Sequence, residues 1–187
     1  SASLVGSEMC IRDRNLEIAS HVANDIFNDS NFPNMNGDLL INCLESFKMP
    51  PGRGEIFSLN KFKIIDDSYN ANPESVKAAL DHLSGYKENR KFFVFGDMKE
   101  LGANEEIFHK KIGQYAVEKA DILLTVGKLA KNAQSNSNNF ALSLHFNDNF
   151  SLLEKLNELL TDGDIVLIKG SRSMQLDQLI NELKNVK

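Results

Sequence analysis

Residues 62–85 read FKIIDDSYNANPESVKAALDHLSG and contain a complete strand–turn–helix unit. A short apolar run predicts a strand, and a polar turn follows it. We expect a helix over residues 73–84, with Asn72 as its N-cap and Pro73 at its first position, where a missing N–H costs nothing. Gly85 lies just beyond the expected end of the helix. This unit is the building block of a parallel sheet.

The same alternation of strands and helices continues along the chain. Apolar runs predict strands over residues 92–95, 122–126, 140–144 and 165–168. Helical spacing of apolar residues predicts helices over residues 104–120, 128–133, 150–160 and 173–186. Upstream, two short strands are expected over residues 55–59 and 62–66, joined at Asn60-Lys61. The sequence therefore predicts an α/β fold with a Rossmann-like, mostly parallel sheet and helices on both of its faces.

The region before this sheet has a different character. Residues 4–14 read LVGSEMCIRDR, which resembles the translation of a transposase sequencing adaptor, so we expect residues 1–14 to be a non-native leader. Residues 15–27 and 38–47 have helical spacing, and the run Pro50-Pro51-Gly52 ends the second helix.

Composition excludes several classes of protein. The net charge of −5 and the isoelectric point of about 5.4 argue against a nucleic-acid-binding surface. No apolar run approaches the roughly 18 residues of a membrane span. Cys10 and Cys43 have neither metal-binding nor redox spacing, which fits a reducing cytosol.

Polar loops follow three of the expected strands: residues 66–73 (DDSYNANP), 96–102 (GDMKELG) and 169–173 (KGSRS). Ligands of open parallel sheets bind at the carboxyl ends of the strands, where these loops lie. The last loop sets two cations and two hydroxyls before an expected helix N-terminus, which suits a carboxylate or phosphate. The alternative is structural, because Asn and Asp often cap helices and Gly often ends strands. Adjacent Asp66 and Asp67 repel each other unless a ligand or cation shares them.

Several catalytic signatures do not occur in the sequence. There is no Gly-x-x-x-x-Gly-Lys-[Ser/Thr] phosphate loop and no Gly-x-Ser-x-Gly nucleophile elbow. The four histidines, His21, His82, His109 and His145, are scattered, and we expect them to pack or to lie at the surface. From the pattern alone, the chain is an α/β domain that binds a small anionic ligand.

The three loops, together with the segment Pro51-Gly52-Arg53-Gly54, resemble the signature segments of the Mur ligase family over about residues 38–187. The resemblance implies that residues 15–61 are the remnant of a central ATP-binding domain and that residues 62–187 are the Mur ligase C-terminal domain. The tyrosine in the first loop and the second loop are similar to those of the family member that adds D-alanyl-D-alanine.

This resemblance implies an ATP- and Mg²⁺-dependent ligase of peptidoglycan precursor synthesis. ATP phosphorylates the carboxylate of UDP-N-acetylmuramoyl-tripeptide, and the amine of D-alanyl-D-alanine then attacks the acyl phosphate. The part that binds the phosphates and the metal is missing, so we expect no catalytic residue and no metal ligand in this segment, which alone would not be catalytic. The resemblance further implies a cytoplasmic enzyme, monomeric at full length, without a nucleic-acid partner or membrane insertion.

The resemblance also implies roles for eight residues. On the nucleotide side it places Arg53, Asp67 and Asn70, with Asp67 near the ribose. It implies that Asn72 and Asp97 line the closed domain interface, and that Lys169, Ser171 and Arg172 face the incoming dipeptide. Two other readings stay open: a sibling Mur ligase that adds another amino acid, and a stand-alone nucleotide- or anion-binding module.

Overall fold

The computed structural model describes residues 50–185. The expectations for residues 1–14 and for the helices over residues 15–27 and 38–47 lie outside this range. A compact unit begins at Pro50. The strand over residues 55–59 pairs with the strand that follows it in the same sheet. The expected domain boundary at Phe62 stays a prediction.

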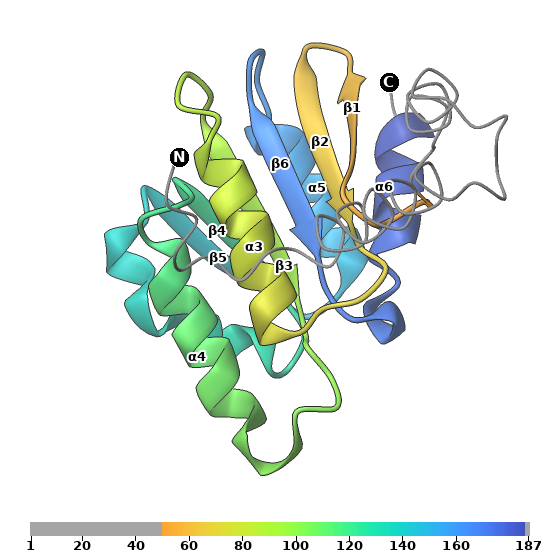
Figure 1. Cartoon of the computed structure of the whole chain (residues 1–187). Coiled ribbons are helices and arrows are strands. Elements are labelled where there is room, and N and C mark those ends of the chain that lie inside the picture. Colours follow the sequence, from red (N-terminus) through yellow and green to blue (C-terminus); the bar gives the residue numbers. More distant parts are fainter. Residues whose placement is uncertain (1–49, 186–187) are drawn as a thin grey trace, which may run out of the picture. The chain divides into compact units, whose positions relative to one another are not determined.

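Six strands form one mixed sheet in the order β1-β2-β6-β3-β4-β5 (Figure 1). The strands are β1 (Glu55–Leu59), β2 (Phe62–Asp67), β3 (Lys91–Gly96), β4 (Ile122–Val126), β5 (Leu142–Phe146) and β6 (Ile165–Lys169). The β1–β2 hairpin is antiparallel, and every other neighbouring pair is parallel. The predicted α/β fold with a mostly parallel sheet is therefore confirmed.

Helices cover both faces of the sheet. The α-helices are α3 (Pro73–Ser84), α4 (Glu105–Ala116), α5 (Asn149–Leu159) and α6 (Leu176–Asn185), and the 3₁₀ helices are η1 (Gly102–Asn104), η2 (Ala130–Asn139) and η3 (Arg172–Met174). Helices α3, α4 and η2 pack on one face, and α5 and α6 pack on the other. Figure 1 shows α3 and α4 in front of the strands and α5 behind them.

Successive side chains along a strand point to opposite faces of the sheet, so each strand contributes to two hydrophobic cores, one on each face. Ile64 packs toward α5 and α6, whereas its neighbour Ile65 packs toward α3 and α4. Phe92 and Phe93 divide in the same way, and all four side chains are almost completely buried. Strands buried on both faces are continuously apolar, which is why these runs lack a polar alternation.

Several helix and strand bounds differ from expectation. Helix α4 ends at Ala116 rather than at residue 120, and η2 spans Ala130–Asn139 rather than residues 128–133. Strand β5 begins at Leu142 rather than Phe140, because η2 extends to Asn139 and Phe140 packs as a buried residue of the core. Helix α6 begins at Leu176 rather than Ser173, because η3 precedes it and Gln175 has a left-handed backbone with φ of 52°.

Candidate functional site at the carboxyl edge of the sheet

The three polar loops meet at one edge of the sheet. Strand β6 lies between β2 and β3 and runs parallel to both, so Lys169 is in register with Asp67 on one side and with Phe95 on the other. The backbone N–H of Ser171 donates to the carbonyl of Asp97 at 2.9 Å, which ties the third loop to the second. The structure therefore brings together the loops that the sequence singled out.

The loops at this edge lead to helices on opposite faces of the sheet. The loops after β2 and β3 lead to α3 and α4 on one face, whereas the loop after β6 leads to α6 on the opposite face. In α/β sheets, ligands commonly bind outside the strand ends where neighbouring connections diverge in this way. Strand β6 is at the centre of this divergence.

Asp66 and Asp67 point to different partners and do not share a ligand. Asp66 is buried, and its carboxylate accepts the backbone N–H of Ser68 at 3.1 Å and the Ser68 hydroxyl at 2.6 Å. Asp67 lies on the other side of the strand, where its Oδ2 pairs with Nζ of Lys169 at 2.5 Å. Separate partners remove the repulsion that the sequence suggested.

Lys169 does not present its charge to the open edge. Its side chain is 2% exposed, and its ammonium donates to Asp67 Oδ2 and, at 3.0 Å, to the carbonyl of Asn70. A buried ammonium needs such acceptors, because burying an unpaired charge is costly. The sequence revealed the lysine but not the pair, because the pairing depends on strand order.

Asp97 anchors the turn that follows β4. This buried carboxylate accepts the backbone N–H groups of Leu129 and Ala130 through Oδ1, at 2.9 and 2.8 Å. Gly127 allows this approach, since its φ is +105° and a Cβ there would lie 2.5 Å from Oδ1. Oδ2 pairs with the half-exposed Lys99 at 2.9 Å. The structural contacts of Asp97 thus account for most of its hydrogen-bonding capacity.

The basic loop differs from the expected α-helix N-terminus. Ser171 is buried, with its hydroxyl 3.1 Å from that of Ser173. Arg172 is 63% exposed and pairs with Asp177 at 2.7 Å. Because α6 starts beyond Gln175, the dipole of an α-helix does not point directly at residues 169–173. Within this loop, the guanidinium of Arg172 is therefore the exposed charge, whereas the ammonium of Lys169 is buried.

The two asparagines of the first loop have local partners. Asn72 is the N-cap of α3, as expected: its Oδ1 accepts the N–H of Ser75 at 2.8 Å, and the Ser75 hydroxyl accepts the Asn72 N–H at 3.1 Å. Asn70 accepts the N–H of Ala71 through Oδ1 at 2.8 Å. Both side chains therefore hold the conformation of the loop between β2 and α3.

Arg53 lies against the first loop, although it precedes β1. The carbonyl of Gly52 accepts the N–H of Tyr69 at 2.9 Å, and the N–H of Gly54 donates to the carbonyl of Asp66 at 2.7 Å. The guanidinium carbon of Arg53 is 4.0 Å from the centre of the Tyr69 ring. Arg53 and Tyr69 are both exposed, so this stacked pair can contact a ligand.

The buried side chain of His109 holds the second loop in place through a hydrogen bond to its backbone. The sequence did not predict this role. The completely buried ring accepts the N–H of Met98 through Nε2 at 2.8 Å, and Nδ1 donates to the carbonyl of Glu105 at 2.6 Å. Burial lowers the pKa of His109, which favours the neutral ring, and because Nε2 accepts the N–H of Met98, the proton of that ring is on Nδ1. Its helical position four residues after Glu105 was visible in the sequence, but the contact with Met98 was not.

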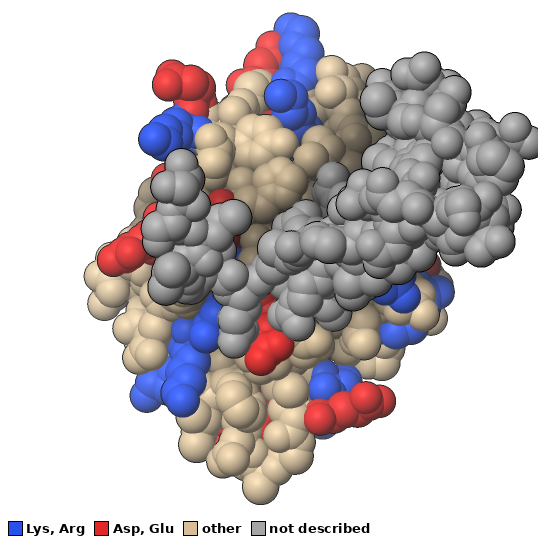
Figure 2. Space-filling model, in the orientation of Figure 1, with Lys and Arg blue, Asp and Glu red and all other residues tan. Residues whose placement is uncertain are grey.

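Two wider properties concern the described part of the chain. Over residues 50–185, no group of three or more His, Cys, Asp or Glu side chains is arranged to hold a metal ion. None of the helices in that range is long and apolar enough to cross a membrane. Figure 2 shows acidic and basic side chains interspersed on the face that it draws.

Curated relatives match most of this region. The UDP-N-acetylmuramoyl-tripeptide–D-alanyl-D-alanine ligase of Bacillus subtilis (strain 168) is 39% identical over 128 residues, which cover 64% of this chain and 27% of that protein. The ligase of the same name from Escherichia coli (strain K12) is 34% identical over 148 residues, covering 75% and 31%. The chain thus spans less than a third of the length of these relatives.

Solved structures agree with the fold. A crystal structure of MurF from Acinetobacter baumannii superimposes with a TM-score of 0.73 at 25% identity, covering 83% of this chain and 35% of that one. The MurF ligase from Thermotoga maritima, crystallised with ADP, gives a TM-score of 0.66 at 24% identity, covering 79% and 36%. The family model of the Mur ligase glutamate ligase domain matches residues 52–172, and the chain belongs to the Mur ligase family.

Proposed function

We propose that this chain is the C-terminal part of an ATP-dependent ligase that joins D-alanyl-D-alanine to UDP-N-acetylmuramoyl-tripeptide. The observation that carries the proposal is the match to curated relatives that bear this name, at 39% and 34% identity. The match to the family model, over residues 52–172, includes the carboxyl edge of the sheet, where the exposed Arg53 and Arg172 offer cations to anionic substrates. Arginine suits this task because its planar fork can pair with a carboxylate or phosphate through two hydrogen bonds.

The nucleotide would bind beside the first loop. Asp67 remains 22% exposed, and within residues 50–185 no hydrogen bond reaches its Oδ1. A carboxylate oxygen of this kind can accept a ribose hydroxyl, while Arg53 can contact a phosphate. Asn70 would complete this side of the site through the loop that it shares with Asp67.

The dipeptide would bind beside the third loop. Arg172 can pair with its free carboxylate, and Ser171 holds the loop against Asp97 through its backbone. We propose that Asn72 and Asp97 shape the closed interface through the loops that they anchor. Lys169 is assigned a different role below, because its ammonium is already bound.

We propose that the reaction needs more of the protein than residues 50–185. In the proposed enzyme, ATP transfers its γ-phosphoryl group to the tripeptide carboxylate, and the dipeptide amine then displaces phosphate to form the amide. We propose that the phosphates and Mg²⁺ bind mainly outside residues 50–185, so the segment alone would not catalyse ligation. We propose that the enzyme acts in the cytoplasm, where ATP and a UDP-linked precursor would be its substrates, and that it acts as a monomer.

The test is ligation by the full-length protein. ADP release is measured with ATP, Mg²⁺, UDP-N-acetylmuramoyl-tripeptide and D-alanyl-D-alanine, and each component is left out in turn. The proposal expects ADP release to require both the tripeptide precursor and the dipeptide. Release that instead requires D-glutamate, L-lysine or meso-diaminopimelate would identify a sibling ligase. Nucleotide binding without any ligation would identify a binding module.

A further inference from the structure

Lys169 is the most deeply buried cation at the carboxyl edge. It ends β6, the strand between β2 and β3, and its ammonium reaches across to the first loop. The two acceptors there are Asp67 Oδ2 and the carbonyl of Asn70, which come before and after Tyr69 in the sequence. A single cation thus fixes both the carboxylate and the backbone of that loop.

The two carboxylate oxygens of Asp67 have different surroundings because Lys169 binds one of them. Oδ2 is bound to Lys169, whereas Oδ1 receives no hydrogen bond from the described residues. The side chain of Asp67 keeps 22% of its exposure while that of Lys169 keeps 2%. The pair therefore presents one carboxylate oxygen to a ligand and withholds the ammonium from it.

We propose that Lys169 is a positioning residue for the nucleotide, which acts through Asp67 and does not touch the dipeptide. This inference rests on the proposed function, in which Asp67 accepts a hydroxyl of ATP. Without the ammonium, the carboxylate would be free to rotate and the loop would lose the tie at Asn70. Binding of ATP would weaken, while the dipeptide site around Arg172 would remain intact.

The experiment uses the full-length ligase and the variant Lys169→Met, which keeps the length of the side chain but removes its charge. We expect the KM for ATP to rise about tenfold, as for the loss of one charge-assisted interaction, with the KM for D-alanyl-D-alanine unchanged. Lys169→Gln, which still donates to Asp67, serves where the methionine variant does not fold. It should also raise the KM for ATP, by less than tenfold, and leave the KM for D-alanyl-D-alanine unchanged.

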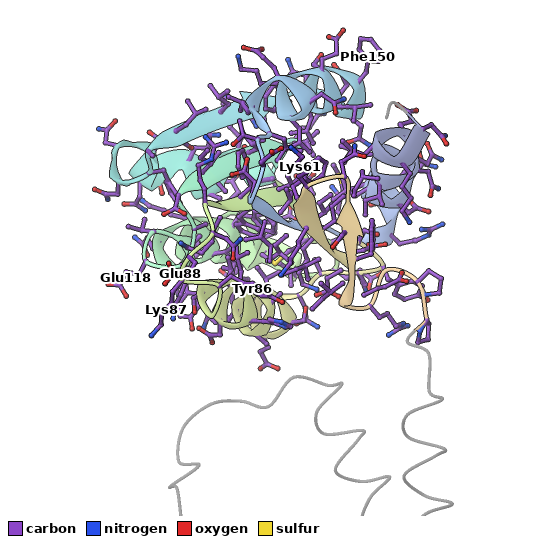
Figure 3. The ribbon with its side chains drawn as sticks, turned by 90° about the horizontal axis from the view of Figure 1, so that it is seen from above. Lys61, Tyr86, Lys87, Glu88, Glu118 and Phe150 are labelled. Carbon is purple, nitrogen blue, oxygen red and sulfur yellow. The ribbon has the colours of Figure 1, made fainter. Side chains whose placement is uncertain are left out.

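A double-mutant cycle separates positioning from a general loss of stability. If Lys169 acts through Asp67, then Lys169→Met should add little to the KM for ATP in an Asp67→Asn background. A purely structural role would give additive effects. The matched control is Lys61→Met, which removes an exposed ion pair with Asp162. Lys61, labelled in Figure 3, directly precedes β2 and so lies at the amino end of that strand, and its replacement should leave both constants unchanged.

Two results would overturn the inference. One is a rise in the KM for the dipeptide with that for ATP unchanged, which would mean that Lys169 contacts the dipeptide. The other is an additive double-mutant cycle. Both are distinct from failure of the proposed function, in which the unsubstituted enzyme would not ligate D-alanyl-D-alanine.

Discussion

Arg172 and Lys169 belong to one short loop but differ in where their charges lie. The ammonium of Lys169 is buried against Asp67, whereas the guanidinium of Arg172 is 63% exposed and forms a surface ion pair with Asp177. Exposed pairs of this kind contribute little to stability, so Arg172 can exchange its partner for a ligand at small cost. The chemistry available to each side chain follows from this difference in burial.

Arg172→Ala in the full-length ligase should raise the KM for D-alanyl-D-alanine about tenfold to a hundredfold, since a charge-assisted hydrogen bond contributes about 1.5–3 kcal/mol. Steady-state kinetics would measure this change. The KM for ATP should not change. Asp177→Asn is the control, because it releases the guanidinium without removing it, and it should not weaken dipeptide binding. A rise confined to the KM for ATP would reverse our assignment of the loops.

His109 makes stability depend on pH. Burial lowers its pKa in the folded state, so the neutral ring is stabilising above the ordinary histidine pKa of about 6.5. As pH falls below that value, the unfolded state takes up a proton that the folded state resists. The free energy of unfolding should then fall by up to about 1.4 kcal/mol per pH unit from this group until its folded pKa is reached.

Urea unfolding between pH 7.5 and pH 5 would measure this dependence. His109→Gln should be less stable at neutral pH, because the ring also accepts the N–H of Met98, but its stability should fall less steeply on acidification. His145 contributes in the same direction, since burial lowers its pKa too, so some dependence should persist. An equal slope in the variant and the unsubstituted chain would contradict the prediction.

At the scale of elements, α4 and η2 approach each other through a glycine. A Cβ on Gly113 would lie 1.9 Å from the carbonyl oxygen of Ala133, a distance that backbone atoms cannot relieve by a rotamer change. Both elements cover the same face of the sheet, and η2 leads directly to β5. The position of β5, at the edge of the sheet, therefore depends on the absence of a side chain at Gly113.

Gly113→Ala should lower the free energy of unfolding by about 3 kcal/mol, the upper end of the usual cost of overpacking. Helix propensity alone would predict the opposite sign, because alanine favours helices over glycine. Chemical denaturation measures the change. Gln114→Ala, at the next and exposed position of α4, is the control and should be nearly neutral. A stabilised Gly113→Ala variant would show that α4 and η2 separate easily.

At the scale of the molecule, the compact unit includes β1. Its residues pair with β2 along the whole strand, and Lys184 of α6 lies 4.1 Å from the ring centre of Phe57. A chain that begins at Pro50 should unfold in one cooperative transition. A chain that begins at Phe62 should be less stable by about 2 kcal/mol or more, because it exposes the edge of β2. Equal denaturation midpoints for the two chains would place the boundary at Phe62.

Much of the fold could be predicted because apolar runs and caps are local signals. The bounds of α3 follow from Asn72, Pro73 and Gly85, and the doubly buried strands follow from runs such as residues 92–95. The contacts at the site could not be predicted in this way. The pairing of Lys169 with Asp67 requires β6 to lie beside β2, and the contact of His109 with Met98 requires the packed loop. Both depend on residues that tertiary structure brings together.

The position of β6 in the middle of the sheet has a consequence for synthesis on the ribosome. Strands β2 and β3 are made early, but β6, the strand that joins them, is made after β4 and β5. Until Lys169 has left the exit tunnel, the nascent chain presents two unpaired apolar strand edges facing a gap. Translation that stalls before Ile165 would therefore leave an aggregation-prone intermediate that needs chaperones, because unpaired strand edges can pair with strands of other chains.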